Sequence, residues 1–146
     1  MLTTSEILID TSIIVHSLNK DSFRHSKAVT YLSRLAGQPK AVTHQNIMEA
    51  YRVLTHPKHP NPMTKQQALD ALKYYVDNCR VISPTEDTFK SLNTVMASSS
   101  VVGNKIMNAY LVATIKANSI TKIATFNKRD WEDFVGIEII DLETQA

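Results

Sequence analysis

The sequence predicts an α/β domain with a short, mainly parallel sheet and helices on both of its faces. Five short runs rich in apolar and β-branched residues indicate strands, at 6–9, 40–43, 80–82, 122–125 and 137–140. Between them lie longer segments whose apolar residues recur at helical spacing. Strands that alternate with helices favour parallel pairing, because each crossover helix must pack back onto a face of the sheet.

Four segments carry an apolar stripe at helical spacing, and we expect each stripe to face the core. The stripes consist of Val29, Leu32 and Leu35; of Ile47, Tyr51 and Leu54; of Leu69, Leu72 and Val76; and of Ile106, Tyr110, Ala113 and Ala117. Pro57, Pro60 and Pro62 exclude regular helix from the segment 56–62. A loop there should precede a helix that is opened by Thr64.

Length and composition indicate one globular domain that spans residues 1–146. The formal net charge of +2 neither requires nor opposes nucleic-acid binding. The single cysteine, Cys79, excludes an internal disulfide and suits a reducing compartment. No apolar run approaches the ~20 residues that cross a bilayer, and the N-terminus lacks a signal-peptide pattern. We therefore expect a cytoplasmic protein with no membrane partner.

Three acidic residues occupy positions where an α/β protein can bind a ligand. Asp10 follows the run 6–9 directly, and Asp130 follows the run 122–125 across a short turn. Parallel sheets bind their ligands at the carboxyl ends of such strands. Glu49 lies in a strongly apolar helical stretch, where a charge is costly unless it is at the edge of a face or has a function. Carboxylates of this kind suit Mg²⁺ or Mn²⁺, which need only a few protein ligands.

Each acid also has a purely structural alternative. Asp10 and Asp130 could be helix caps or turn residues only, and Glu49 could pair with Arg52 on the surface of its helix. Three acids at comparable topological positions are more informative than any one of them, and together they indicate a metal-binding pocket.

At four places the sequence resembles PIN domains, in particular the toxins of VapBC toxin–antitoxin pairs. The segments that carry the resemblance are 7–12, 45–55 with the following Pro57, 103–114 and 125–131. The resemblance covers nearly the whole chain. It implies a three-layer α/β/α sandwich and a pocket of four acids that binds Mg²⁺ or Mn²⁺. It also implies an endoribonuclease that cuts RNA such as tRNA, a cognate antitoxin that inhibits it, and a homodimer.

By this resemblance Asp10 is the first acid, Glu49 the second and Asp130 the last. The third acid is missing, because Asn108 stands where the family pattern has Asp. Asparagine offers one neutral carbonyl oxygen in place of two anionic oxygens. We therefore expect all four residues to form the catalytic and metal-binding pocket, but with weakened metal affinity and activity.

Further residues are expected to support this pocket. Hydroxyl and amide groups that could hold water or ligands, or else act as simple caps, belong to Thr11, Ser12, Thr125 and Asn127. Cations that could bind RNA phosphates, or else form an ordinary solvated surface, belong to Arg52, Lys105, Lys128 and Arg129. Lys105 precedes Asn108 by three residues, so we expect the two side chains to lie on the same side of their helix.

For the antitoxin we expect a groove between helices, formed by Val29, Tyr31 and Leu32 and by the segment 69–75. A catalytically disabled module that binds RNA or the antitoxin is the main alternative to an enzyme. An unrelated phosphatase or receiver-like α/β domain is a third possibility, because its acids also lie at strand ends. His56 and His59 lack a third ligand nearby and do not predict a zinc site.

Overall fold

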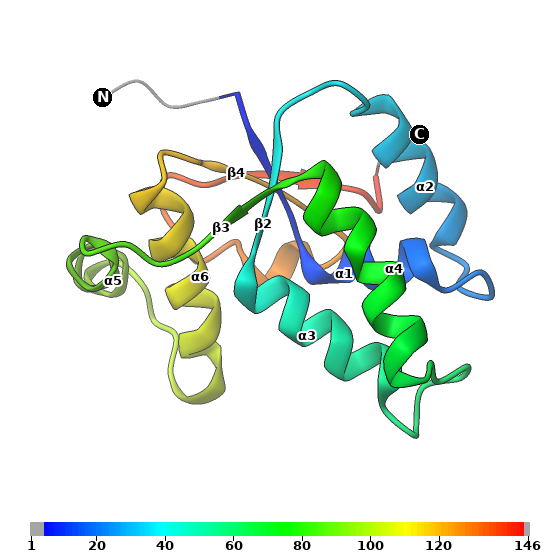
Figure 1. Cartoon of the computed structure of the whole chain (residues 1–146). Helices are drawn as coiled ribbons and strands as arrows, with labels where there is room; N and C mark the ends of the chain where they lie inside the picture. Colours follow the sequence, from blue (N-terminus) through cyan, green and yellow to red (C-terminus); the bar gives the residue numbers. More distant parts are fainter. Residues whose placement is uncertain (1–4, 145–146) are drawn as a thin grey trace.

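The computed structural model describes residues 5–144 and contains a five-stranded sheet with helices on both faces (Figure 1). In chain order the elements are β1 (Ile7–Ile9), α1 (Thr11–Leu18), α2 (His25–Arg34), β2 (Lys40–Thr43), α3 (His44–Thr55), α4 (Lys65–Asn78), β3 (Arg80–Ile82), α5 (Thr88–Ala97), α6 (Ile106–Ala117), β4 (Lys122–Thr125) and β5 (Glu138–Asp141). Short 3₁₀ turns at Gly103–Lys105 and Lys128–Asp130 precede α6 and follow β4. All five expected strands are present, within one residue at their ends.

The strand order is β3-β2-β1-β4-β5, and every neighbouring pair is parallel. The sheet is thus fully parallel, as the alternation of strands and helices predicted. β1 and β4 lie beside each other at its centre, with Ile9 opposite Ala124. Their carboxyl ends therefore meet at one edge, where Asp10 follows β1 and the turn with Asp130 follows β4.

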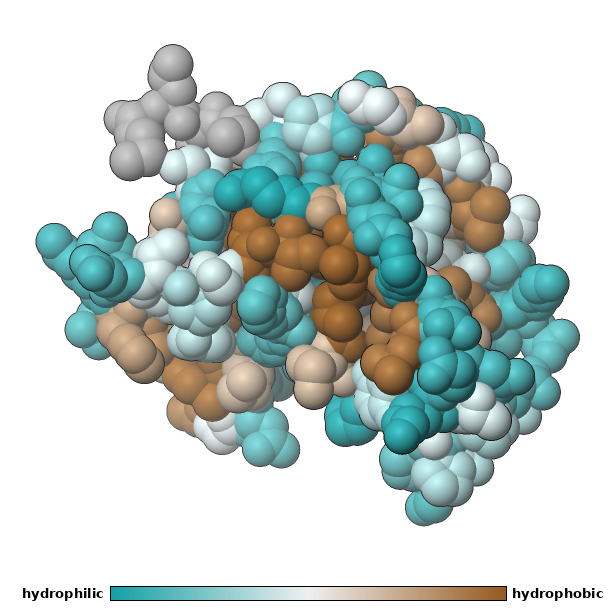
Figure 2. All heavy atoms as spheres, viewed as in Figure 1, coloured by the Kyte–Doolittle hydropathy of each residue, from teal (hydrophilic) through white to brown (hydrophobic). Residues whose placement is uncertain are grey.

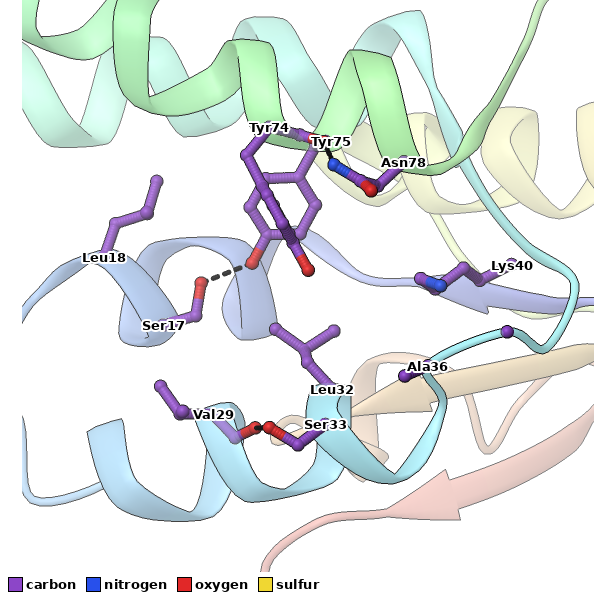
Figure 3. Close-up of a pocket in the computed structure, with 11 residues that line it drawn as sticks. Ser17, Leu18, Val29, Leu32, Ser33, Ala36, Lys40, Tyr74, Tyr75 and Asn78 are labelled. Atoms are coloured by element: carbon purple, nitrogen blue, oxygen red, sulfur yellow. Dashed lines mark hydrogen bonds between the residues drawn. The ribbon is translucent and has the colours of Figure 1, made fainter.

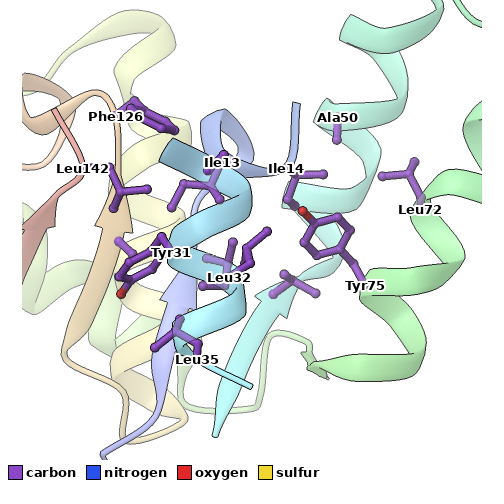
Figure 4. Close-up of a cluster of buried hydrophobic side chains, with 14 of the residues drawn as sticks. Ile13, Ile14, Tyr31, Leu32, Leu35, Ala50, Leu72, Tyr75, Phe126 and Leu142 are labelled. Atoms are coloured by element: carbon purple, nitrogen blue, oxygen red, sulfur yellow. The ribbon is translucent and has the colours of Figure 1, made fainter. Parts of the chain in front are cut away.

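Alternating side chains of the strands divide the core into two layers. Ile9, Val42 and Ala124 belong to the cluster that packs against α1–α4; Figure 4 labels several of its helical members, such as Ile13 and Leu32. Leu8, Ala41 and Ile123 point to the opposite face, where they pack against α5 and α6. This arrangement confirms the three-layer α/β/α sandwich. No helix within residues 5–144 combines the length and the apolar character that crossing a membrane requires.

The apolar stripes are less buried than expected. Val29, Leu69, Val76 and Ile106 are exposed, because each lies at the edge of its stripe rather than over the sheet. The helix α5 was not expected at all. Its sequence mixes polar and apolar residues, and only Thr88 and Val95 become buried.

Two grooves follow from these exposed residues. One, of about 480 Å³, lies between α1, α2 and α4 and is lined by Val29, Leu32 and Tyr75 (Figure 3). The other, of about 490 Å³, lies between α3 and α4 and includes Leu69; Figure 2 shows apolar side chains there. The residues expected to form one antitoxin groove are therefore divided between two grooves, because Leu69 borders a different one. Tyr31 is also buried in the core rather than on a groove.

Candidate metal site

A cavity of about 280 Å³ opens at the edge where β1 and β4 end. It brings together all four residues of the expected pocket, which come from four separate segments of the chain. The predicted residues that line it are Asp10, Thr11, Ser12, Glu49, Asn108, Asn127 and Asp130. Thr125 lies directly beneath, where its hydroxyl donates to Asp10.

Asp10 is the most buried acid of the cavity, with 6 % of its surface exposed. Its Oδ1 accepts the backbone N–H of Thr11 at 2.8 Å, so it caps α1. Its Oδ2 accepts the hydroxyls of Thr125 at 2.7 Å and Ser12 at 3.2 Å. The capping alternative therefore describes only one of the two oxygens. The other is held in place by side chains from α1 and β4, which fixes the carboxylate at the cavity wall.

Burial raises the pKa of the Asp10 carboxyl above its ordinary value. The hydrogen bonds from Thr125, Thr11 and Ser12 favour the charged form and limit that rise. The buried indole N–H of Trp131 lies near enough to lower the pKa of the Asp10 carboxyl as well, with the smallest effect of these groups. That N–H forms no hydrogen bond of normal length with the residues that the structure describes. A negative charge at Asp10 is thus costly, and a nearby cation would reduce the cost.

Glu49 is tied into the cavity by one group from α1 and one from its own helix, α3. Its Oε2 accepts the hydroxyl of Thr11 at 3.2 Å, and its Oε1 accepts the amide of Gln45 at 3.2 Å. Within residues 5–144, no ion pair joins Glu49 to Arg52. The surface-pair alternative was therefore wrong, and Glu49 faces the cavity from α3.

Two residues that position Glu49 were missed in the sequence. Asn46 is fully buried, caps α3 with Thr43, and donates from Nδ2 to the Thr11 hydroxyl at 3.0 Å. Gln45 also donates to the Met107 carbonyl at 3.3 Å and so links α3 to α6. The capping sequence at Thr43 was a usable signal for Asn46, but its contact with Thr11 lies 35 residues away.

Asn108 and Asp130 complete the cavity. Asn108 is half-buried near the start of α6, and Asp130 is exposed at the end of the turn that follows β4. Within residues 5–144, no three His, Cys, Asp or Glu side chains lie close enough together to hold a metal ion. Asp10, Glu49 and Asp130 line the same cavity but do not form such a close group by themselves.

The donor set nevertheless has the chemistry that a hydrated Mg²⁺ or Mn²⁺ requires. Three acidic residues and one asparagine line one cavity that is large enough for water. Mg²⁺ keeps several waters and is usually held by only one or two protein carboxylates. The residues therefore fit such an ion, with one negative charge fewer than four acids would provide.

The remaining predicted residues divide into those at the cavity and those away from it. Lys105 and Arg129 line an adjacent cavity of about 420 Å³, which shares Asp130 with the first. Lys105 is the N-cap residue of α6, with helical backbone angles, and it lines the adjacent cavity rather than that of Asn108. Lys128 lies 3.8 Å from Glu132 on the surface, and Arg52 is exposed on α3 outside both cavities.

The comparisons with known proteins agree with this architecture. Residues 7–135 match the PIN domain family. A curated relative, ribonuclease VapC24 from Mycobacterium tuberculosis, is 24 % identical over 129 residues, which cover 86 % of this chain and 89 % of the relative. The crystal structure of VapBC2 from Rickettsia felis bound to a promoter DNA fragment superposes with a TM-score of 0.71 at 14 % identity, covering 92 % of this chain and 96 % of that one.

A second solved structure is that of VapC20 from Mycobacterium tuberculosis, described as a toxin that cleaves the sarcin–ricin loop. Its TM-score is 0.62 at 18 % identity, with 90 % of this chain and 98 % of that one covered. The family match excludes the receiver-like and phosphatase alternatives. The chain belongs to the PIN domain family.

Proposed function

We propose that this chain is a metal-dependent endoribonuclease of the VapC toxin type. The observation that carries the proposal is the convergence of Asp10, Glu49, Asn108 and Asp130 on one cavity in a PIN domain. The ribonuclease name of the VapC24 relative supports the reaction class. An RNA substrate suits the site because its scissile phosphodiester carries the negative charge that a bound cation attracts.

The residues of the cavity divide the work of such a reaction. A bound Mg²⁺ or Mn²⁺ would activate water and neutralise charge on the phosphate. Asp10, Glu49, Asp130 and the Asn108 carbonyl would hold it. Hydroxyl donors keep Asp10 oriented, and Gln45 and Thr11 do the same for Glu49. No covalent protein nucleophile is needed.

Asp10→Asn should stabilise the metal-free protein at neutral pH, because it removes a buried charge. The pKa of Asp10 is raised in the folded state. The folded protein therefore gains stability from a protonated Asp10 below the ordinary Asp pKa of about 3.9. It loses this stability as the pH rises through the pKa of the folded state. Urea unfolding in EDTA at pH 7 should therefore show a more stable variant, and the difference should vanish toward pH 3.

Mn²⁺ should reverse this order. At 100 times its dissociation constant it should stabilise the unmodified protein by about 2.7 kcal/mol, and the Asp10→Asn variant by much less. Asp87→Asn, at an exposed residue outside the cavity, is the matched control and should change neither curve. An Asp10→Asn variant less stable than the unmodified protein in EDTA would contradict the account.

Asn108→Asp should restore the fourth acid with almost no change in shape. We expect RNA cleavage at limiting Mn²⁺ to rise at least 10-fold, since the loss of even an outer-sphere partner costs roughly 10–100-fold. The measurement is cleavage of a labelled RNA as a function of Mn²⁺ concentration. Asn93→Asp, which adds the same charge on the exposed side of α5, is the control.

The outcome also decides between the two candidate functions. Cleavage by both forms supports an active enzyme. Cleavage by the Asp form alone identifies the chain as a disabled PIN module that binds RNA or an antitoxin, the alternative that Asn108 favours. Absence of Mn²⁺-dependent cleavage in both forms counts against the nuclease proposal itself.

The adjacent cavity with Lys105 and Arg129 is the proposed path for the RNA backbone beside the cut site. Two phosphate contacts on a single strand contribute about 1.4 to the slope of log affinity against log salt concentration. The Lys105→Gln, Arg129→Gln double variant should lose about that much slope, measured by fluorescence anisotropy. Arg52→Gln and Lys128→Gln, outside both cavities, serve as controls. An unchanged slope in the double variant would remove these two residues from the path.

We also propose a small cognate antitoxin that occupies the groove between α1, α2 and α4 (Figure 3). The complexes among the structural neighbours, such as VapBC2, support this kind of partner. Val29→Glu with Tyr74→Glu should abolish inhibition by a small protein encoded beside this chain but leave RNA cleavage intact. Leu69→Glu, in the groove between α3 and α4, is the control. Inhibition that survives the Val29 and Tyr74 changes would place the antitoxin elsewhere.

The homodimer stays a prediction of the family resemblance, and sedimentation of the purified chain tests it: a monomer at micromolar concentration would refute it.

A further inference from the structure

The cavity of the four site residues extends beyond them along α1 and α3. Its far part is lined by Val15, His16 and Val53. His16 follows Thr11 by five residues, which at 1.5 Å per residue places it roughly 7.5 Å along the helix axis from Thr11. The cavity therefore has an acidic end and a second end whose titratable group is His16.

The imidazole of His16 is held in one orientation. Its Nδ1 lies 2.7 Å from the Ser22 hydroxyl, and its ring packs edge-on against Phe126 at a centroid distance of 5.3 Å. The backbone carbonyl of His16 is bound by His25 Nδ1 at 3.0 Å. These contacts tether α1 to α2 and fix the ring from two sides.

The same contacts allow the tautomer in which the ring proton lies on Nε2. The Ser22 oxygen accepts the backbone N–H of Arg24 at 3.1 Å, so the hydroxyl hydrogen is available for His16 Nδ1. With Nδ1 as the acceptor, the ring proton lies on Nε2. Across residues 5–144, no hydrogen bond from another group reaches Nε2. Burial and the charge of Arg24 lower the pKa of His16, which keeps the ring neutral at neutral pH.

We propose that His16 is a substrate-binding residue, whose Nε2–H donates a hydrogen bond to a backbone oxygen of the nucleotide next to the cut. The inference rests on the proposed ribonuclease function and adds a contact that no acid or surface cation provides. Val15 and Val53 line the same part of the cavity and make it less polar than the end with the acids. A neutral donor also leaves the charge of the carboxylates free for the cation.

Two substitutions separate this role from a purely structural one. In His16→Gln the amide nitrogen reaches the position of Nε2 and can replace the donor. In His16→Asn the amide reaches only the position of Nδ1, which keeps the contact with Ser22 but removes the donor. Substrate binding predicts that Asn is the more harmful change, whereas a structural role predicts that Gln is.

The experiment uses the Asn108→Asp chain as parent and a labelled 15-nucleotide RNA with Mn²⁺. His16→Asn should raise KM about tenfold, the effect of one hydrogen bond to a charged or polar oxygen. Its kcat and Mn²⁺ half-saturation should stay close to those of the parent. His16→Gln should stay within about twofold of the parent KM, as should His25→Asn, whose side chain lies outside the cavity.

An unchanged KM in His16→Asn, or a larger loss in His16→Gln than in His16→Asn, would overturn the inference and leave the nuclease proposal intact. If the parent cleaves no RNA, the nuclease proposal fails separately. RNA affinity of the same variants, measured by anisotropy, then tests His16 directly: a tenfold loss in the Asn variant supports the contact, and equal affinities refute it.

Discussion

The architecture depends on placing a carboxylate in the interior at the end of the central strand. An unpaired buried charge is expensive, and Asp10 avoids much of that cost through donors from three neighbours. The N–H of Thr11 and the hydroxyls of Ser12 and Thr125 all point to it. These donors belong to α1 and β4, so the geometry of the acid and the pairing of the two central strands depend on each other.

The same network continues into the other layers. Thr11 donates to Glu49 and accepts from Asn46, which connects α1 to α3. Gln45 carries the connection on to the backbone at Met107. The two helical layers are thus joined by polar side chains across the edge of the sheet as well as by apolar packing through it. The walls of the cavity are therefore connected to one another by side-chain hydrogen bonds.

Much of the fold was predictable because strands and acids leave local signals. β-Branched runs predicted all five strands, and their parallel order explains why Asp10 and Asp130 approach each other. The exposure of Val29 and Leu69 was not predictable, since periodicity cannot tell which edge of a stripe lacks a neighbour. Asn46 and His16 were missed for a related reason: their significance comes from contacts with segments that are remote in sequence or in a cavity that no local pattern reveals.

The acids around the cavity differ in how far they are built into the scaffold. Asp10 is enclosed and capped, Glu49 is half-buried and held by two donors, and Asp130 stands in solvent at the rim. Mutational tolerance should therefore increase outward: the rim acid is exchangeable at little cost to folding, whereas the innermost one accepts only a replacement that also caps α1, such as asparagine. For binding studies that need an inactive protein with an unchanged fold, a substitution at residue 130 removes one acid of the cavity with the least effect on the structure.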